Sequence, residues 1–143
     1  MLSQEYDCDA EASAYESAEK CEDNASSHEK YDENLHVIDE EQQYHDPVLE
    51  AGNSWWSEVL DTYKNVYNST INANFANMAW DTRERFGCAI FTCSKKHHVV
   101  CHYPKIEKTE GEQIYKIGDG PCSDCKDYNS TVTCDEELCS AIF

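Results

Sequence analysis

The sequence predicts a mixed α/β protein, and three observations support this fold class. Apolar residues recur at helical spacing in several segments of the first eighty residues. Two short β-prone runs then follow each other around a polar turn, which is the pattern of a β-hairpin. The last 22 residues hold four cysteines and little else that could form a core. We therefore expect helices packed on a small sheet, followed by a disulfide-stapled appendage.

The first predicted helix covers residues 6–21. Ala10, Ala14, Ala18 and Cys21 recur there at helical spacing among many acids. Residues 24–43 are polar and rich in turn formers, and they show no periodicity apart from the short apolar patch at 35–38.

Two further helices are predicted before the hairpin. One begins at Asp46-Pro47, because an N-cap residue followed by proline is a typical helix start. We expect it to present a broad apolar face made of Leu49, Trp55, Trp56, Val59, Leu60 and Tyr63. Thr70 could cap the next helix, whose inward-facing residues would be Ile71, Phe75, Met78 and Ala79.

The hairpin is predicted from residues 86–93 and 97–103, joined by Ser94-Lys95-Lys96, and a third strand is expected at residues 113–117. Three histidines lie close together near Cys101, but strand alternation puts His98 and His102 on one face and His97 on the other. They cannot all converge on a metal, so we expect solvated histidines.

Charge and hydropathy exclude several classes of partner. Lys and Arg number 11 against 29 Asp and Glu, and residues 1–50 alone hold 16 acids and 2 bases. Nucleic acid and anionic lipid headgroups both require a basic surface, which this chain lacks. The longest apolar runs, such as Val99-Val100-Cys101, fall far short of the ~20 residues that span a bilayer.

Cysteine usage predicts an extracellular protein. Nine cysteines in 143 residues are unusual in the cytosol unless they bind metal, and their odd number leaves one unpaired. Three Asn-x-Ser/Thr sequons, at Asn24, Asn68 and Asn129, are expected glycosylation sites of a secreted chain. No signal peptide precedes the body of the chain, so we expect a fragment in which Met1 is an internal methionine. In the tail, Cys122-x2-Cys125 together with Cys134-x4-Cys139 resembles a zinc knuckle, but disulfides are favoured in a secreted protein.

Several motifs, in order, resemble the CAP superfamily of cysteine-rich secretory proteins, insect venom allergens, plant pathogenesis-related proteins and secreted nematode proteins. They are Glu33-Asn34-Leu35, Ser54-Trp55-Trp56-x-Glu58, the segment 74–80, Phe86-Gly87-Cys88-Ala89-Ile90, Val99-Val100-Cys101-His102-Tyr103 and Pro121-Cys122-x-x-Cys125. The resemblance implies a CAP-type α-β-α sandwich that lacks its first helix, in residues 1–120, and a cysteine-rich hinge-like tail in residues 121–143. It also implies a disulfide between Cys88 and Cys101, and one from Cys93 to Cys21 or Cys8.

The same resemblance implies a central cleft with two histidines and two glutamates. Its positions fall on His28, Glu33, Glu58 and Asn74, where asparagine replaces the second histidine. His28, Glu33 and Glu58 could hold a divalent cation such as zinc, but an amide is a poor zinc ligand, so we expect weak binding or none. The alternative is that His28 is merely exposed and that the glutamates accept bonds from backbone N–H groups.

The function implied by the resemblance is that of a secreted, non-catalytic, venom allergen-like protein that binds host or extracellular partners. One alternative is a carrier of sterols or other lipids, although Trp55, Trp56 and Phe75 are explained more simply as core residues. Another is a metal-dependent hydrolase that uses His28, Glu33 and Glu58. No serine or cysteine stands beside a base in a recognisable catalytic motif, so no catalytic residue is expected.

Overall fold

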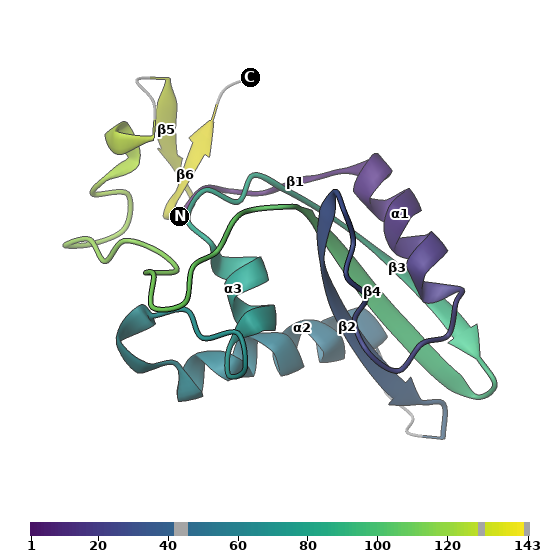
Figure 1. The fold of residues 1–143 in the computed structure, drawn as a ribbon. Helices are drawn as coiled ribbons and strands as arrows, with labels where there is room; N and C mark the ends of the chain where they lie inside the picture. The colour runs from purple at the N-terminus through teal and green to yellow at the C-terminus, as the bar shows by residue number, and fades with distance from the viewer. Residues whose placement is uncertain (42–45, 129–130, 142–143) are drawn as a thin grey trace.

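The computed structural model describes residues 1–41, 46–128 and 131–141, and it shows helices on both faces of one sheet (Figure 1). Helix α1 (Cys8–Ala18) covers one face, and α2 (Pro47–Ser57) and α3 (Ala73–Ala79) cover the other. The predicted α-β-α sandwich is therefore confirmed. Among the described residues, no helix is long and apolar enough to cross a membrane.

The central sheet has the strand order β1-β3-β4-β2. The hairpin of β3 (Arg85–Cys93) and β4 (Lys96–Pro104) is confirmed, and β2 (Tyr31–Asp39) pairs antiparallel with β4. The two-residue strand β1 (Glu5–Tyr6) runs parallel to the start of β3. The strand predicted at 113–117 is wrong: Gln113 forms only an isolated bridge with Val66, and the N–H and C=O of Ile114 bond to other loops.

Helix α1 begins where predicted to within two residues. The Asp7 carboxylate accepts hydrogen bonds from the N–H groups of Asp9 and Ala10, at 2.8 and 3.1 Å, and so caps the helix. Its alanines at 10, 14 and 18 are all buried against the sheet. The contact requires glycine at 87, because a Cβ there would lie 2.3 Å from the backbone nitrogen of Glu11.

The predicted apolar face of the second helix is largely wrong. Asp46 caps α2 as expected, and Trp55 is buried, but Leu49, Trp56, Leu60 and Tyr63 are exposed. For Leu60 and Tyr63 the reason is that α2 ends at Ser57 and the chain turns through the short 3-10 helices η1 (Glu58–Asp61) and η2 (Tyr63–Asn65). The helical period therefore stops before Val59. Leu49 and Trp56 lie within α2, on its exposed side. Helix α3 starts after Asn72 rather than at Thr70, which leaves Ile71 exposed and buries Phe75 and Ala79.

Two disulfides link segments within the sandwich. Cys88 and Cys101 face each other across β3 and β4 and form the predicted bond. Cys93 bonds to Cys21, one of the two partners expected for it, and Cys8 is left free and exposed.

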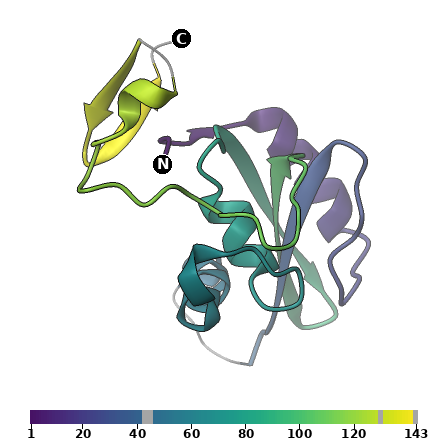
Figure 2. The ribbon, with the colours of Figure 1, turned by 60° about the vertical axis from the view of Figure 1, so that its left-hand side comes forward.

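The tail is stapled by two disulfides and lies beside the sandwich (Figure 2). It contains η3 (Cys125–Asp127), β5 (Val132–Asp135) and β6 (Leu138–Ala141), and the bonds Cys122–Cys134 and Cys125–Cys139 confirm that its cysteines form disulfides. The start of the chain docks on it: Ser3 N–H donates to the Cys139 carbonyl, and Cys139 N–H donates to that of Met1. Leu2 is buried against this tail.

Candidate functional site

A buried carboxylate–imidazole pair lies between α1 and the sheet. Glu33 on β2 is in register with His102 on β4, and its Oε2 lies 2.7 Å from His102 Nε2. The carboxylate also accepts bonds from the Ser17 hydroxyl at 2.5 Å and from Ser26 N–H at 2.8 Å. Burial alone would raise the pKa of Glu33, but these hydrogen bonds outweigh it and hold that pKa below its ordinary value.

His28 is connected to this pair by the hydroxyl of Ser13 on α1. The Ser13 hydroxyl is 3.0 Å from His102 Nδ1 and 3.5 Å from His28 Nε2. The ring of Tyr31 stacks on His102 at 5.2 Å between centroids. His102, which the sequence placed in solvent, thus lies next to both Glu33 and His28, whose ring centroid is 5.3 Å from that of His102.

The expectation of solvated strand histidines is wrong for two of the three. His98 and His102 are 2% and 0% exposed, because both point to the sheet face that α1 covers. Alternation along β4 correctly put them on one face, but it gave no information about which face a helix would cover. His97 lies half-buried, with Nδ1 3.0 Å from the Thr92 hydroxyl.

The second glutamate belongs to a different cluster. Glu58 accepts a hydrogen bond from the Asn74 side-chain amide at 2.7 Å and another from Phe75 N–H at 2.8 Å. It therefore caps the start of α3. The alternative interpretation of the two glutamates fits these contacts, since Glu33 and Glu58 each accept a bond from a backbone N–H.

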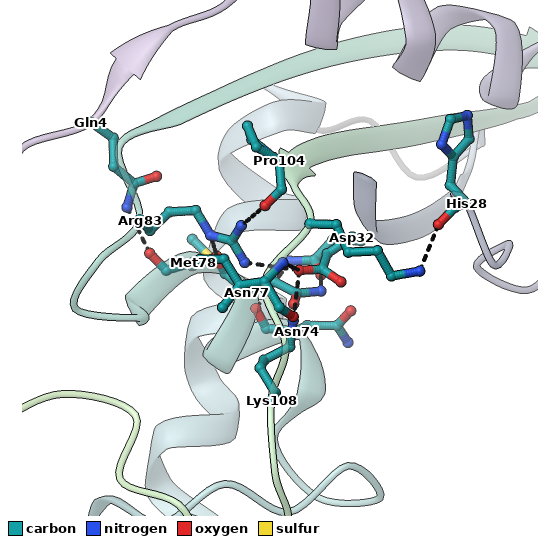
Figure 3. Close-up of polar contacts among 12 residues, drawn as sticks. Gln4, His28, Asp32, Asn74, Asn77, Met78, Arg83, Pro104 and Lys108 are labelled. Atoms are coloured by element: carbon teal, nitrogen blue, oxygen red, sulfur yellow. Dashed lines mark hydrogen bonds and ion pairs between the residues drawn. The ribbon is translucent and has the colours of Figure 1, made fainter. Parts of the chain in front are cut away.

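Strand alternation separates the two clusters. Glu33 points to α1, whereas its neighbour Asn34 points to α3, where it donates to the Asn74 carbonyl and accepts a bond from Asn77. Figure 3 shows the His28 ring turned away from Asn74. Glu33 and Glu58 thus lie on opposite faces of the sheet and do not converge on one ion. Within the described part of the chain, no group of three His, Cys, Asp or Glu side chains could hold a metal.

A second buried ionic network was missed from the sequence (Figure 3). The Arg83 guanidinium is 1% exposed and donates to the carbonyls of Asn77 and Pro104 and, at 3.1 Å, to the Asp32 carboxylate. Lys108 Nζ lies 2.6 Å from the same carboxylate oxygen. Burial would raise the pKa of Asp32, but its bonds with Lys108 and Arg83 lower it. No local pattern marks this network, because Arg83 stands in a run of charged residues that looks exposed.

The arrangement of Ser13, His102 and Glu33 has the order of a hydroxyl, an imidazole and a carboxylate. Ser13 lies in the middle of α1, whose backbone N–H groups are engaged in the helix. Helix α1 itself therefore offers no free pair of N–H donors beside Ser13. The hydrogen bonds of Ser13, Ser17, Glu33 and His102 link α1 to β2 and β4.

Comparisons with known proteins agree with this fold. Residues 1–103 match the CAP family model, described as the cysteine-rich secretory protein family. Hookworm platelet inhibitor 1 of Ancylostoma caninum is 46% identical over 138 residues, which cover 96% of this chain and 67% of that protein. The Ancylostoma secreted protein of the same species is 30% identical, over 99% of this chain and 36% of its own length.

The crystal structure of hookworm platelet inhibitor superposes with a TM-score of 0.85 at 44% identity. That match covers 100% of this chain and 78% of the other. The chain thus spans about two thirds of the first curated relative and about a third of the second.

Proposed function

Because the chain belongs to the CAP family of cysteine-rich secretory proteins, we propose that it is a secreted, non-catalytic protein that binds an extracellular protein of a host. The observation that carries this proposal is the match over almost the whole chain to a relative named as a platelet inhibitor. Platelets are therefore the first cells on which to look for a partner.

Extracellular location is supported by chemistry of the chain itself. Four disulfides link eight of the nine cysteines, and such bonds persist in oxidising compartments. We propose glycosylation at the three sequons. Asn24 lies in an exposed loop, and Asn68 is half-buried, with its side-chain oxygen accepting a bond from the Thr70 hydroxyl. Asn129 lies outside the described residues.

The contacts at the candidate site support a non-catalytic role. Glu33 and Glu58, the two carboxylates on which a hydrolase would depend, are engaged in separate structural hydrogen bonds. The sterol-carrier alternative needs accessible aromatic walls. Trp55 and Phe75 are 3% and 1% exposed and belong to the core, whereas the core assignment is wrong for Trp56, which is 44% exposed.

Binding of the fluorescently labelled protein to washed platelets and leukocytes tests the proposal. We expect saturable binding to at least one of them that excess unlabelled protein displaces. Protein whose disulfides have been reduced and alkylated is the matched control, and it should lose this binding. Binding that does not saturate on either cell type, or that the reduced protein retains, would contradict the proposal.

A further inference from the structure

Most of strand β3 is an uncovered edge of the sheet. Its neighbour β1 pairs only with Arg85 and Phe86, after which the chain leaves the edge to enter α1. The next outward-facing groups, the N–H and C=O of Cys88, bond to the Tyr6 hydroxyl at 3.4 and 3.1 Å. In the described part of the chain, no strand lies outside β3 beyond this point.

The outward-facing backbone groups after Cys88 belong to Ile90 and Thr92. Phe86 faces β1, where its carbonyl accepts the Asp7 N–H, and Cys88 faces the same way. Since the backbone of an antiparallel strand alternates between its two sides, Ile90 and Thr92 present their N–H and C=O groups to the free edge. Such a row of unpaired groups is a template for another extended chain.

A groove runs beside this edge. A cavity of about 490 Å³ lies between α1 and β3, with Tyr15 and Glu16 of α1 on one side and Ala89 and Ile90 on the other. Figure 1 shows α1 lying along β3. The Tyr15 ring is half exposed and meets Phe91 edge-to-face at 5.8 Å between centroids. The groove thus offers apolar contacts next to the unpaired backbone.

The rim of the groove is acidic. Glu11 and Glu16 of α1 both line it and are exposed. The unpaired backbone groups of the free edge favour binding of an extended polypeptide, and the acidic rim favours a polypeptide with positively charged side chains. A second copy of this chain is a poorer fit, because it carries the same net charge of −18 and would bring its own Glu11 and Glu16 toward the two rim glutamates of the first copy.

We propose that the free edge of β3 and the groove along α1 bind an extended, basic segment of the partner protein as an added β-strand. This proposal rests on the proposed function and specifies where and how the partner binds. Backbone groups of Ile90 and Thr92 pair with the segment. Its basic side chains lie against Glu11 and Glu16 on the sheet face that α1 covers, and its apolar side chains, which alternate to the other face, contact Ile90.

The probe is the blocked heptapeptide acetyl-Lys-Val-Lys-Val-Lys-Val-Lys-amide, titrated into the isotope-labelled natural protein and followed by NMR. Two N-methylated isomers, one blocked at inner lysine amides and one at inner valine amides, keep every side chain and the charge. In an added strand only one set of amides faces β3, so one isomer should bind at least tenfold more weakly, whereas the other stays within about twofold of the parent peptide. Equal binding by both isomers would overturn the proposal.

Protein variants test the same geometry independently. Thr92→Pro removes an edge N–H at a position where an edge strand tolerates proline, and it should weaken peptide binding at least tenfold relative to Thr92→Ala. Glu16→Gln should weaken binding about threefold, whereas Glu29→Gln, at an exposed acid outside the groove, should leave it unchanged. Slowed hydrogen exchange at Ile90 and Thr92 in the bound natural protein is expected as well. Equal affinities for Glu16→Gln and Glu29→Gln would contradict the assigned role of the rim.

The outcomes separate this inference from the proposed function. Cell binding that Thr92→Pro retains in full would remove the edge from the interface while leaving the function intact. Peptide binding as described, without saturable binding to cells, would contradict the function and not the groove. If the natural protein formed concentration-dependent dimers and Thr92→Pro abolished them, a second copy would be the occupant of the edge. That result would overturn the proposal of a basic segment.

Discussion

The imidazole of His102 and the carboxylate of Glu33 lie 2.7 Å apart and are both buried beneath α1. The pair joins neighbouring strands, and its remaining acceptor sites take bonds from Ser17 and Ser26, so that three segments meet at one carboxylate. A buried charge with this many partners is expensive to disturb. The position of α1 on the sheet therefore depends on the charge state of Glu33.

Glu33→Gln should make folding less sensitive to acid. The pKa of Glu33 lies below its ordinary value of 4.5, so its contribution to stability is complete above that pH and is lost as pH falls through the folded-state value. At pH 7 we expect the variant to be less stable by about 2 kcal/mol. Urea unfolding at several pH values between 7 and 3 should show that difference shrinking below pH 4.5. The exposed-site control Glu29→Gln should match the natural protein, and a difference that stays constant down to pH 3 would contradict this prediction.

Asp32→Asn should destabilise the protein by about 3 kcal/mol or more, because it leaves the buried Arg83 and the partly buried Lys108 without their anion. The double variant Asp32→Asn/Arg83→Met should cost less than the sum of the two single changes. Chemical denaturation of the four proteins measures this coupling. Strict additivity would show that the carboxylate and the guanidinium contribute independently.

The two sandwich disulfides should differ in their effect on stability. Cys21–Cys93 closes a sequence separation of 72 residues and Cys88–Cys101 one of 13. Loop-closure entropy then predicts losses of about 4 kcal/mol and about 3 kcal/mol when each pair is replaced by alanine. Guanidinium unfolding of both double variants gives the ranking. A larger loss for the Cys88/Cys101 pair would mean that packing of Cys101 in the core outweighs chain entropy.

Zinc titration by calorimetry should show no tight site in the natural chain. Glu33 and Glu58 lie on opposite faces of the sheet, so at most two of the expected ligands can meet at one ion, whereas zinc sites use three or four. Asn74→His would place one imidazole beside Glu58 alone, and we expect its affinity to stay weak. The prediction would be contradicted if Asn74→His bound zinc with a Kd below micromolar and the added change Glu33→Gln abolished that binding. Residues from both faces of the sheet would then reach one ion through a cleft.

Local patterns predicted the parts of the fold that depend on nearby residues. The alanines at 10, 14 and 18 predicted α1, and the polar turn at Ser94 and Lys95, where both residues have positive φ, predicted the hairpin. The family resemblance supplied the Cys88–Cys101 bond. These features require no knowledge of what lies across the sheet.

The missed features depend on distant partners. Strand β2 carries Asp32, Glu33 and Asn34, which are poor strand formers, and it is stable because each finds a partner far along the chain in Arg83, His102 or Asn77. The same limit explains why the predicted site residues lie in two clusters. Their order in the sequence could be matched to a family, but the sequence did not show to which face of the sheet each side chain points.

The bonds between residues 1–3 and β6 also determine how the protein resists stretching. Leu2 and Cys139 form a parallel bridge, so a pull on the two ends loads these bonds in shear, all at once, before the sandwich is reached. The Cys21–Cys93 bond has a further effect. The segment that it closes spans a separation of 72 residues, roughly 240 Å of extended chain, and this segment cannot be stretched out while the bond is intact. On a surface under flow, the molecule would stay short while it is tethered at both ends.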